Sequence, residues 1–434
     1  MDNKNEKEKI LTFPKDFYWG AATSAHQVEG GNHNDWSEWE KKNAERLARK
    51  SESMYARWIP VWEEIKEQAQ NPENYISGRA CDHYNRFKED FQIAKSLNHN
   101  AHRFSIEWSR IEPEEGKFNE KEIEHYRQVI KALRERGLEP FVTLWHYTHP
   151  LWFIARGGWL HPKAGQSFLR FTKKVVSEYK DDVKYWLTFN EPETVAREGY
   201  TQASRPPQER SLIKTFKAMR NLVEIHKKAY LLIHEINSNA MVSFAESLVF
   251  FESYNKWPHN LLLKRILEWW RNGQFVPKVI SHCDFIGLQY YFHSRIRLNP
   301  FVSQWGFQFN ENKLGVSDMG WEIYPEGIYY VLKSLKKYNL PVVITENGLA
   351  DYRDKYRADF IKDHLVWVHK AISEGVDVRG YFYWSFMDNF EWNQGFWPRF
   401  GLVEVDYKTL ERKIRPSAKM YAEICKNNEL KLES

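Results

Sequence analysis

The sequence predicts an α/β fold in which eight parallel strands, each followed by a helical segment, close into a barrel. Two observations lead to this prediction. Short apolar stretches alternate eight times with longer amphipathic stretches along the 434 residues. Polar and aromatic side chains gather directly after the apolar stretches, and the site of such a barrel lies at the C-terminal ends of its strands. Because we find no short repeat and no flexible linker, we expect a single barrel domain over residues 1–434.

The expected strands are runs of apolar, β-branched and aromatic residues bounded by turn signals. In chain order they cover residues 17–23, 101–106, 140–145, 183–189, 241–245, 284–289, 341–345 and 378–384. Amphipathic stretches predict helices over about 82–97, 119–136, 162–179, 212–236, 325–338 and 356–373, with Asn119 as a cap and Pro416 opening a closing helix. Residues 40–77 are charged and helical in pattern, and we expect an elaborated loop of the barrel there.

Two further segments need separate interpretation. Residues 261–270 are apolar with basic residues interleaved, a pattern that fits a barrel helix facing its own sheet or a helix lying on a membrane surface. We favour the barrel helix. Residues 299–321 form a long stretch rich in Trp, Phe and Asn, and loops of this length in a compact domain are often functional.

Composition argues against several classes of protein. The net charge is +5, and acidic and basic residues are interspersed along the chain. We find no basic block that could bind a phosphate backbone, so we do not expect a nucleic-acid-binding protein. No stretch of about 18 apolar residues predicts a membrane span. The first nine residues lack the apolar region of a signal peptide, and the three distant cysteines form neither a disulfide framework nor a metal motif. We expect a cytoplasmic protein whose partner is a small molecule, and neither a nucleic acid nor a membrane.

Tryptophan is unusually frequent, with 19 residues, and aromatic residues make up 16% of the chain. Packing of an aromatic-rich core accounts for about half of them in our interpretation. The rest suit carbohydrate, because the apolar C–H faces of a sugar stack on indole rings.

Two of the expected strands run into a carboxylic acid: strand 183–189 into Glu191 and strand 341–345 into Glu346. In a closed barrel both acids face the same opening. Two carboxyl groups across a site can cleave a glycosidic bond, one protonating the leaving oxygen and the other attacking the anomeric carbon or activating water. For Glu191 alone, an ordinary strand-end acid that caps the next helix is the alternative.

Neighbouring residues suggest how the two acids divide these roles. A nucleophile must stay ionised, which needs a cation or hydrogen-bond donors close by. Arg103, expected to point into the barrel, and Tyr291 are candidates for this support, since a buried arginine needs an anion. The charge of the nucleophile then raises the pKa of the second carboxyl group, which keeps its proton for donation.

The two acidic motifs resemble those of glycoside hydrolase family 1, the β-glucosidase family. Residues 188–192 read TFNEP, similar to the family's acid/base motif, and residues 344–348 read ITENG, similar to its nucleophile motif. The resemblance covers nearly the whole chain, from Phe13 to the last helix. It implies a (β/α)8 TIM barrel with elaborated loops that hydrolyses β-glycosides with retention and without a cofactor or metal. It also implies that Glu191 is the acid/base and Glu346 the nucleophile.

The resemblance assigns further residues one position at a time. Those that match contacts to the non-reducing sugar are Gln27, His146, Asn190, Glu391 and Trp392, with Trp384 as the platform beneath the sugar. Those that match the surroundings of the nucleophile, the aglycone-side wall and the rim are Arg103, Tyr291, Trp321 and Phe400. The pair Glu391-Trp392 favours a neutral sugar, because relatives that act on 6-phosphosugars lack it.

Four positions depart from the family pattern. Gln289 replaces the usual Asn, Tyr147 a usual Trp, Thr148 a usual Asp, and His26 a usual Tyr. They leave open the preference among β-glucosides, β-galactosides, β-fucosides and β-mannosides, while the two acids are unaffected.

Other functions remain as alternatives. A transglycosidase would use the Trp-rich segment around Trp305 and Trp321 to favour an acceptor over water. A non-catalytic sugar-binding barrel should lack one of the two acids, and both are present. A metal-dependent hydrolase is weaker, because His146 and His149 have no partner ligand at a fixed spacing. The sequence does not predict an oligomeric state.

Overall fold

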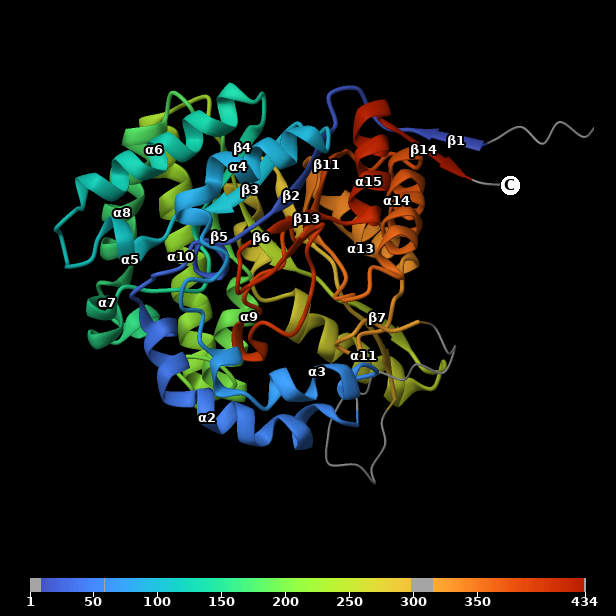
Figure 1. Cartoon of the computed structure of the whole chain (residues 1–434), viewed down its shortest axis with the longest axis horizontal. Coiled ribbons are helices and arrows are strands. Elements are labelled where there is room, and N and C mark those ends of the chain that lie inside the picture. The colour runs from blue at the N-terminus through green and yellow to red at the C-terminus, as the bar shows by residue number, and fades with distance from the viewer. Residues whose placement is uncertain (1–8, 58, 298–314, 433–434) are drawn as a thin grey trace, which may run out of the picture.

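The computed structural model describes residues 9–57, 59–297 and 315–432. Its centre is a closed barrel of parallel strands, as predicted (Figure 1). In order around the barrel the strands are β2 (Tyr18–Ala22), β3 (Ala101–Ser105), β4 (Glu139–Trp145), β5 (Tyr185–Asn190), β6 (Met241–Ser247), β8 (Ile286–Gln289), β10 (Val342–Asn347) and β11 (Val378–Trp384). Pairing of β11 with β2 closes the ring. The predicted strand positions are therefore correct to within a few residues.

The helices that cover the barrel also follow the sequence pattern. They are α4 (His83–Ser96), α6 (Glu120–Glu135), α8 (Ala164–Tyr179), α10 (Leu212–Ile236), α13 (Glu326–Leu335), α14 (Arg357–Ser373) and α15 (Pro416–Asn427). Asn119 caps α6 as predicted, since its side chain accepts a hydrogen bond of 3.1 Å from the backbone N–H of Lys121. Among the described residues, no helix is long and apolar enough to cross a membrane.

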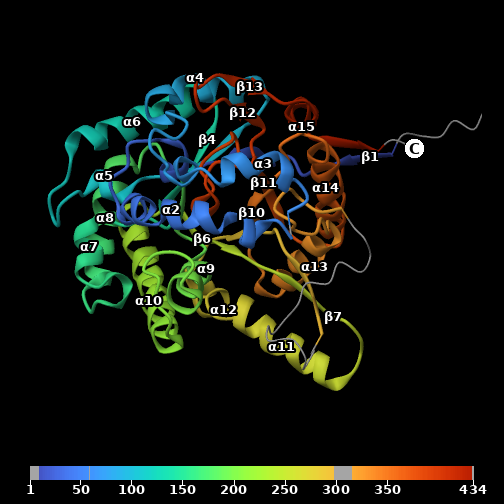
Figure 2. The same ribbon diagram turned by 60° about the horizontal axis from the view of Figure 1, so that its bottom comes forward.

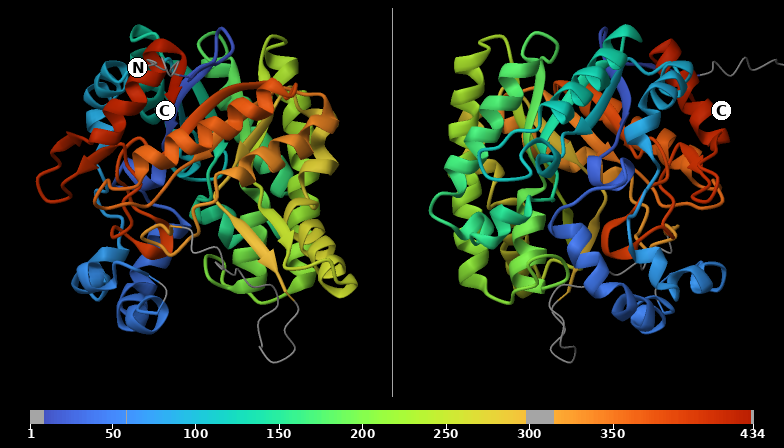
Figure 3. Two further views of the ribbon diagram at one scale, coloured as in Figure 1. Left: turned by 90° about the vertical axis from the view of Figure 1, so that its right-hand side faces the viewer. Right: turned by 60° about the vertical axis from the view of Figure 1, so that its left-hand side comes forward.

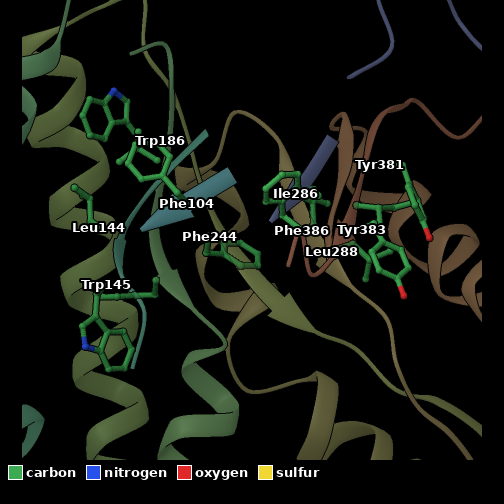
Figure 4. Close-up of a cluster of buried hydrophobic side chains, with 14 of the residues drawn as sticks. Phe104, Leu144, Trp145, Trp186, Phe244, Ile286, Leu288, Tyr381, Tyr383 and Phe386 are labelled. Atoms are coloured by element: carbon green, nitrogen blue, oxygen red, sulfur yellow. The ribbon is translucent and has the colours of Figure 1, made fainter. Parts of the chain in front are cut away.

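Two hydrophobic layers hold the barrel together. One fills the space between strands and helices and includes Phe104, Leu144, Trp186, Phe244 and Ile286 (Figure 4). The other consists mainly of strand residues of opposite orientation, such as Phe141 and Tyr185, whose ring centres lie 4.2 Å apart in a stacked arrangement. Because side chains alternate along each strand, most barrel strands contribute to both layers.

The predicted loop over residues 40–77 is a helical segment. It contains α2 (Asp35–Tyr55), α3 (Trp62–Ala69) and a short 3-10 turn, after the short helix α1 (Ala25–Val28). Asn34 and Ser37 form a capping box at the start of α2. Trp36 of α2 packs on Trp392 with ring centres 4.6 Å apart, and Trp39 packs on Trp36 at 5.3 Å. Figure 3 shows this segment at one end of the barrel, while the closing helix α15 lies at the other.

The interpretation of residues 261–270 as a helix facing the barrel sheet is wrong. Helix α11 (Pro258–Asn272) packs instead on β7 (Phe250–Ser253) and β9 (His293–Ile296), which form a separate two-stranded parallel sheet outside the barrel (Figure 2). An apolar helical stripe packs equally well on either sheet, so the sequence pattern does not distinguish them. Of the stretch 299–321, residues up to 314, including Trp305, lie outside the described residues.

Shorter elements complete the chain. The short helices are α5 (Trp108–Ile111), α7 (Leu151–Ala155), α9 (Pro192–Arg197) and α12 (Val276–Val279). The remaining strands are β12 (Val403–Val405) with β13 (Arg412–Ile414), and β1 (Lys9–Thr12) with β14 (Glu429–Leu432). The last pair is antiparallel and brings the two ends of the described chain together.

Candidate active site

The structure brings Glu191 and Glu346 to the wall of one cavity of about 620 Å³ at the C-terminal ends of the barrel strands. Glu191 directly follows β5, and Glu346 lies near the end of β10. Both side chains are buried. The cavity is of a size that encloses a small ligand rather than a macromolecule.

The backbone turns sharply at Glu191, where φ is +44°. This places Glu191 immediately before α9, but its side chain makes no capping hydrogen bond to that helix. Its Oε2 instead accepts a hydrogen bond from the hydroxyl of Tyr147. The geometry therefore does not support the alternative of an ordinary helix cap.

Glu346 is held by two donors. Nη1 of Arg103 donates to its Oε1, and the hydroxyl of Tyr291 donates to its Oε2 at 2.8 Å. Arg103 lies on β3 and is fully buried. The expectation that this arginine points inward and meets an anion is confirmed by these contacts.

Arg103 also links the two acidic strands. Its Nη2 donates to Oδ1 of Asn190 at 2.6 Å, and Asn190 is the residue before Glu191. The same oxygen accepts a hydrogen bond of 2.7 Å from Nε2 of Gln289. Gln289 is one methylene longer than the usual Asn, and its amide therefore reaches Asn190 and forms a hydrogen bond with it.

The electrostatics of the two acids differ. Burial raises the pKa of Glu346 to about 7, with Arg103 and Tyr291 lowering it and the charge of Glu191 raising it. Burial is also the largest cause of the raised pKa of Glu191, against which Tyr147 and Arg205 act. Two carboxyl groups in a water-poor site do not ionise together easily. Because only Glu346 is in contact with a guanidinium, we infer that the negative charge resides there first.

Most of the other predicted residues line the same cavity. They are His146, Asn190, Tyr291, Trp321, Trp384, Glu391, Trp392 and Phe400. Gln27 lies behind this wall: its Nε2 donates to the carbonyl of Phe390 at 2.8 Å and lies 3.4 Å from Oε2 of Glu391. Burial raises the pKa of Glu391 to about 8, so this acid is predominantly neutral near neutral pH.

His146 lies between two tryptophans, with its ring nearly parallel to those of Trp384 and Trp392 at 6.1 and 6.0 Å. Its Nε2 is 3.2 Å from Nδ2 of Asn190, while Nδ1 has no hydrogen-bond partner among the described residues. Burial, together with the charge of Arg103, lowers the pKa of His146 well below its usual value. A neutral imidazole with an unpaired ring nitrogen is suited to form a hydrogen bond with a sugar hydroxyl group.

Sequence reasoning missed two neighbours of Glu191. Tyr147 was noted only as a departure from the family pattern, and its added hydroxyl is the group that contacts Glu191. Arg205 carried no signal in the sequence. Its Nε lies 2.7 Å from Oε2 of Glu198, and its guanidinium lies 5.5 Å from the centre of the Tyr147 ring.

The outer part of the cavity wall was also missed. It is mostly apolar and comes from β7, α11, β9 and the residues beside them: Val249, Phe251, Leu267, Trp270, Phe292 and Ile296, with Arg271 and Ser294 as its polar members. Within the described ranges, no group of three or more His, Cys, Asp or Glu side chains is arranged to hold a metal ion. His149 instead pairs with Asp35, 2.8 Å between Nδ1 and Oδ2.

Comparison with known proteins identifies the class and then the family. The model of glycosyl hydrolase family 1 matches residues 9–280 and 272–430. Beta-glucosidase A of Thermotoga maritima is 33% identical, with 97% of this chain and 99% of the relative covered. The β-glycosidase from Pyrococcus horikoshii superposes with a TM-score of 0.85 at 39% identity, covering 98% and 97% of the two chains. A Thermotoga maritima β-glucosidase in complex with glucoimidazole gives a TM-score of 0.83 at 31% identity, covering 96% and 99%.

The barrel and its cavity are thus those of a glycoside hydrolase that acts on β-glycosides. Within that class, the chain belongs to glycosyl hydrolase family 1.

Proposed function

We propose that this enzyme hydrolyses β-glucosides with retention of configuration, with Glu346 as the nucleophile and Glu191 as the acid/base. The observation that carries the assignment is the difference between their partners. Glu346 receives a guanidinium and a phenol hydroxyl, whereas Glu191 receives one phenol hydroxyl. The better-supported carboxylate is the one suited to attack, and the other is suited to hold a proton.

The first step forms a glycosyl-enzyme. The ionised carboxylate of Glu346 attacks the anomeric carbon while Glu191 transfers its proton to the glycosidic oxygen, and the aglycone leaves as an alcohol. The negative charge of Glu346 is lost in the new ester, so the pKa of Glu191 falls.

The second step releases the sugar. Glu191, now ionised, takes a proton from water, the water oxygen bonds to the anomeric carbon, and Glu346 departs as a carboxylate. Two displacements on the same carbon restore the original configuration. The sugar leaves as the β-anomer, and Glu191 is protonated again.

The glucoside preference rests on the sugar end of the cavity. Glu391 and Trp392 line it, and the resemblance to the family associates this pair with neutral sugars, because relatives that act on 6-phosphosugars lack it. The relative from Thermotoga maritima carries the name β-glucosidase. A kinetic panel of aryl β-glucoside, galactoside, fucoside, mannoside and 6-phosphoglucoside tests this choice, and a preference for the phosphorylated sugar would contradict it.

Variants at the two acids separate their roles. Glu346→Ala should reduce hydrolysis of every aryl β-glucoside by about 10⁴-fold or more, because the covalent step is lost. Glu191→Ala should reduce it strongly for poor leaving groups and far less for good ones, because only the former need a proton. Equal losses on both kinds of substrate would argue against Glu191 as the acid. Proton NMR of the first product should show the β-anomer.

Transglycosylation is a second activity favoured by one observation, the apolar outer wall of the cavity. An alcohol with an apolar chain would bind there better than water and could intercept the glycosyl-enzyme. Product analysis at high concentrations of an alkyl alcohol should then show alkyl β-glucoside. Glucose as the sole product would exclude this activity.

A further inference from the structure

Helix α11 carries two apolar stripes on adjacent faces. The inner stripe, Leu263, Leu267 and Trp270, recurs at helical spacing; its leucines pack on the cluster around Phe251, and Leu267 and Trp270 line the cavity. The outer stripe, one residue earlier at each position, is Leu262, Ile266 and Trp269. These side chains are 60, 49 and 55% exposed. Asn260 is the one buried residue of this helix. The inner stripe already accounts for the packing of α11 on the rest of the protein.

The exposed apolar side chains extend beyond α11. Phe216 of α10 contacts Trp270 with ring centres 5.4 Å apart, so the start of α10 lies beside α11. We call the combined exposed apolar residues the outer surface: Leu212, Ile213, Phe216, Trp257, Leu261, Leu262, Ile266 and Trp269. Large apolar side chains grouped on one exposed face are typical of a contact surface.

The same two segments are strongly basic. Residues 209–220 and 256–272 each contain four Lys or Arg and one Glu. Together they carry a net charge of +6, whereas the whole chain carries +5. Both glutamates already pair with a lysine, Glu209 with Lys214 and Glu268 with Lys264. The positive charge of this enzyme is therefore concentrated around the outer surface.

We propose that the outer surface binds a membrane whose headgroups are anionic. A helix with exposed aromatic and aliphatic side chains, bordered by Lys and Arg, lies in the headgroup region with its apolar face at the acyl boundary. Each Lys or Arg near an anionic surface adds to the attraction. A second copy of the chain fits less well, because a symmetric dimer through this patch would place two strongly positive surfaces against each other. The proposal does not depend on the roles of Glu191 and Glu346.

Vesicle flotation with the full chain tests the proposal. We expect the enzyme to float with vesicles of phosphatidylglycerol and phosphatidylcholine, to bind pure phosphatidylcholine much more weakly, and to lose binding as salt is raised. The double variant Ile266→Ser/Trp269→Ser should bind the anionic vesicles at least about tenfold more weakly than the wild type, because it buries less apolar area in the membrane.

A matched variant controls for general surface effects. Tyr352 and Tyr356 are 54 and 43% exposed, and Tyr352→Ser/Tyr356→Ser should leave vesicle binding unchanged. Hydrolysis of a soluble aryl β-glucoside, measured without vesicles, reports that each variant is folded. Absence of wild-type binding to anionic vesicles would overturn the proposal. The proposal would also be overturned if the wild type does not float and light scattering shows that it is a dimer, whereas Ile266→Ser/Trp269→Ser is a monomer.

Discussion

At the residue scale, the contact between Tyr147 and Glu191 has a measurable effect on pH dependence. The hydroxyl of Tyr147 donates to the carboxylate, which stabilises its ionised form and lowers the pKa of Glu191. Tyr147→Phe removes this donor and raises that pKa. If Glu191 must be protonated to act, activity should persist to higher pH.

The measurement is the pH profile of kcat/KM on a β-glucoside with a poor leaving group. We expect the fall of kcat/KM on the basic side of the profile to occur at higher pH in Tyr147→Phe than in the wild type. The phenylalanine ring keeps the aromatic packing of Tyr147 on Trp392, so a general loss of structure is not expected. A limb that moves downward would show that the hydroxyl stabilises the protonated carboxyl instead.

Much of the candidate site was predictable because its residues end barrel strands. Glu346 and Arg103 lie on strands whose direction and inward face follow from the apolar pattern. The contact of Tyr147 was not predictable, because the backbone there has φ of +76° and a strand pattern does not report such a bend. Arg205 lies in a loop, where no periodicity indicates which way a side chain points.

At the scale of elements, a buried ion pair secures the segment after β11. The carboxylate of Asp388 accepts hydrogen bonds from Nη1 and Nη2 of Arg415, both 2.9 Å, and from the backbone N–H of Gly401 at 2.9 Å. Asp388→Asn would leave a buried guanidinium without its anion. We expect a loss of about 3 kcal/mol in the free energy of unfolding, measured with urea. Asp377→Asn, in an exposed pair with Arg379, should change it by about 0.5 kcal/mol or less.

The same pair predicts a stability change with pH. The arginines around Asp388 hold the pKa of its buried carboxyl below the usual value. Its contribution is therefore present above the unfolded-state pKa of about 3.9 and is lost as pH falls toward the folded pKa. The wild type should lose more stability than Asp388→Asn as pH is lowered through this range. Parallel losses in the two proteins would contradict the prediction.

Strands and helices of the barrel were predicted well because buried apolar runs and amphipathic stretches differ in period. Helix α10 was expected over 212–236 and covers Leu212–Ile236. Helix α11 was assigned correctly as a helix, but its packing partner was wrong. Its apolar residues lie on two adjacent faces of the helix, and only the tertiary structure shows which face packs on β7 and β9.

At the scale of the whole molecule, β1 and β14 pair at the end of the barrel opposite α2 and α3 (Figure 3). The cavity lies at the other end, where its lining residue Trp392 packs on Trp36 of α2. Leu430 of β14 is almost fully buried. Leu430→Ala should therefore lower the free energy of unfolding by about 2–5 kcal/mol. Because the cavity is distant, kcat on an aryl β-glucoside at low temperature should remain near the wild-type value. Lys431→Ala, whose side chain is exposed, provides the control.

The complete barrel was predictable from the eightfold alternation, because strand-to-strand closure requires little beyond the number and order of the elements. The register between strands was not. The shifts beside Glu346 in β10 and beside Asn190 in β5 depend on packing between neighbouring strands.

The pairing of β1 with β14 has a topological consequence. Lys9 lies directly opposite Leu432, and the two strands run antiparallel. They are geometrically a β-hairpin without its turn, so in a chain shortened to residues 9–432 a two-residue Asn-Gly connection could join them. Such a covalent link would make the backbone circular, and new ends could be opened in the exposed turn at 114–117. We expect this circular permutant to fold into the same barrel.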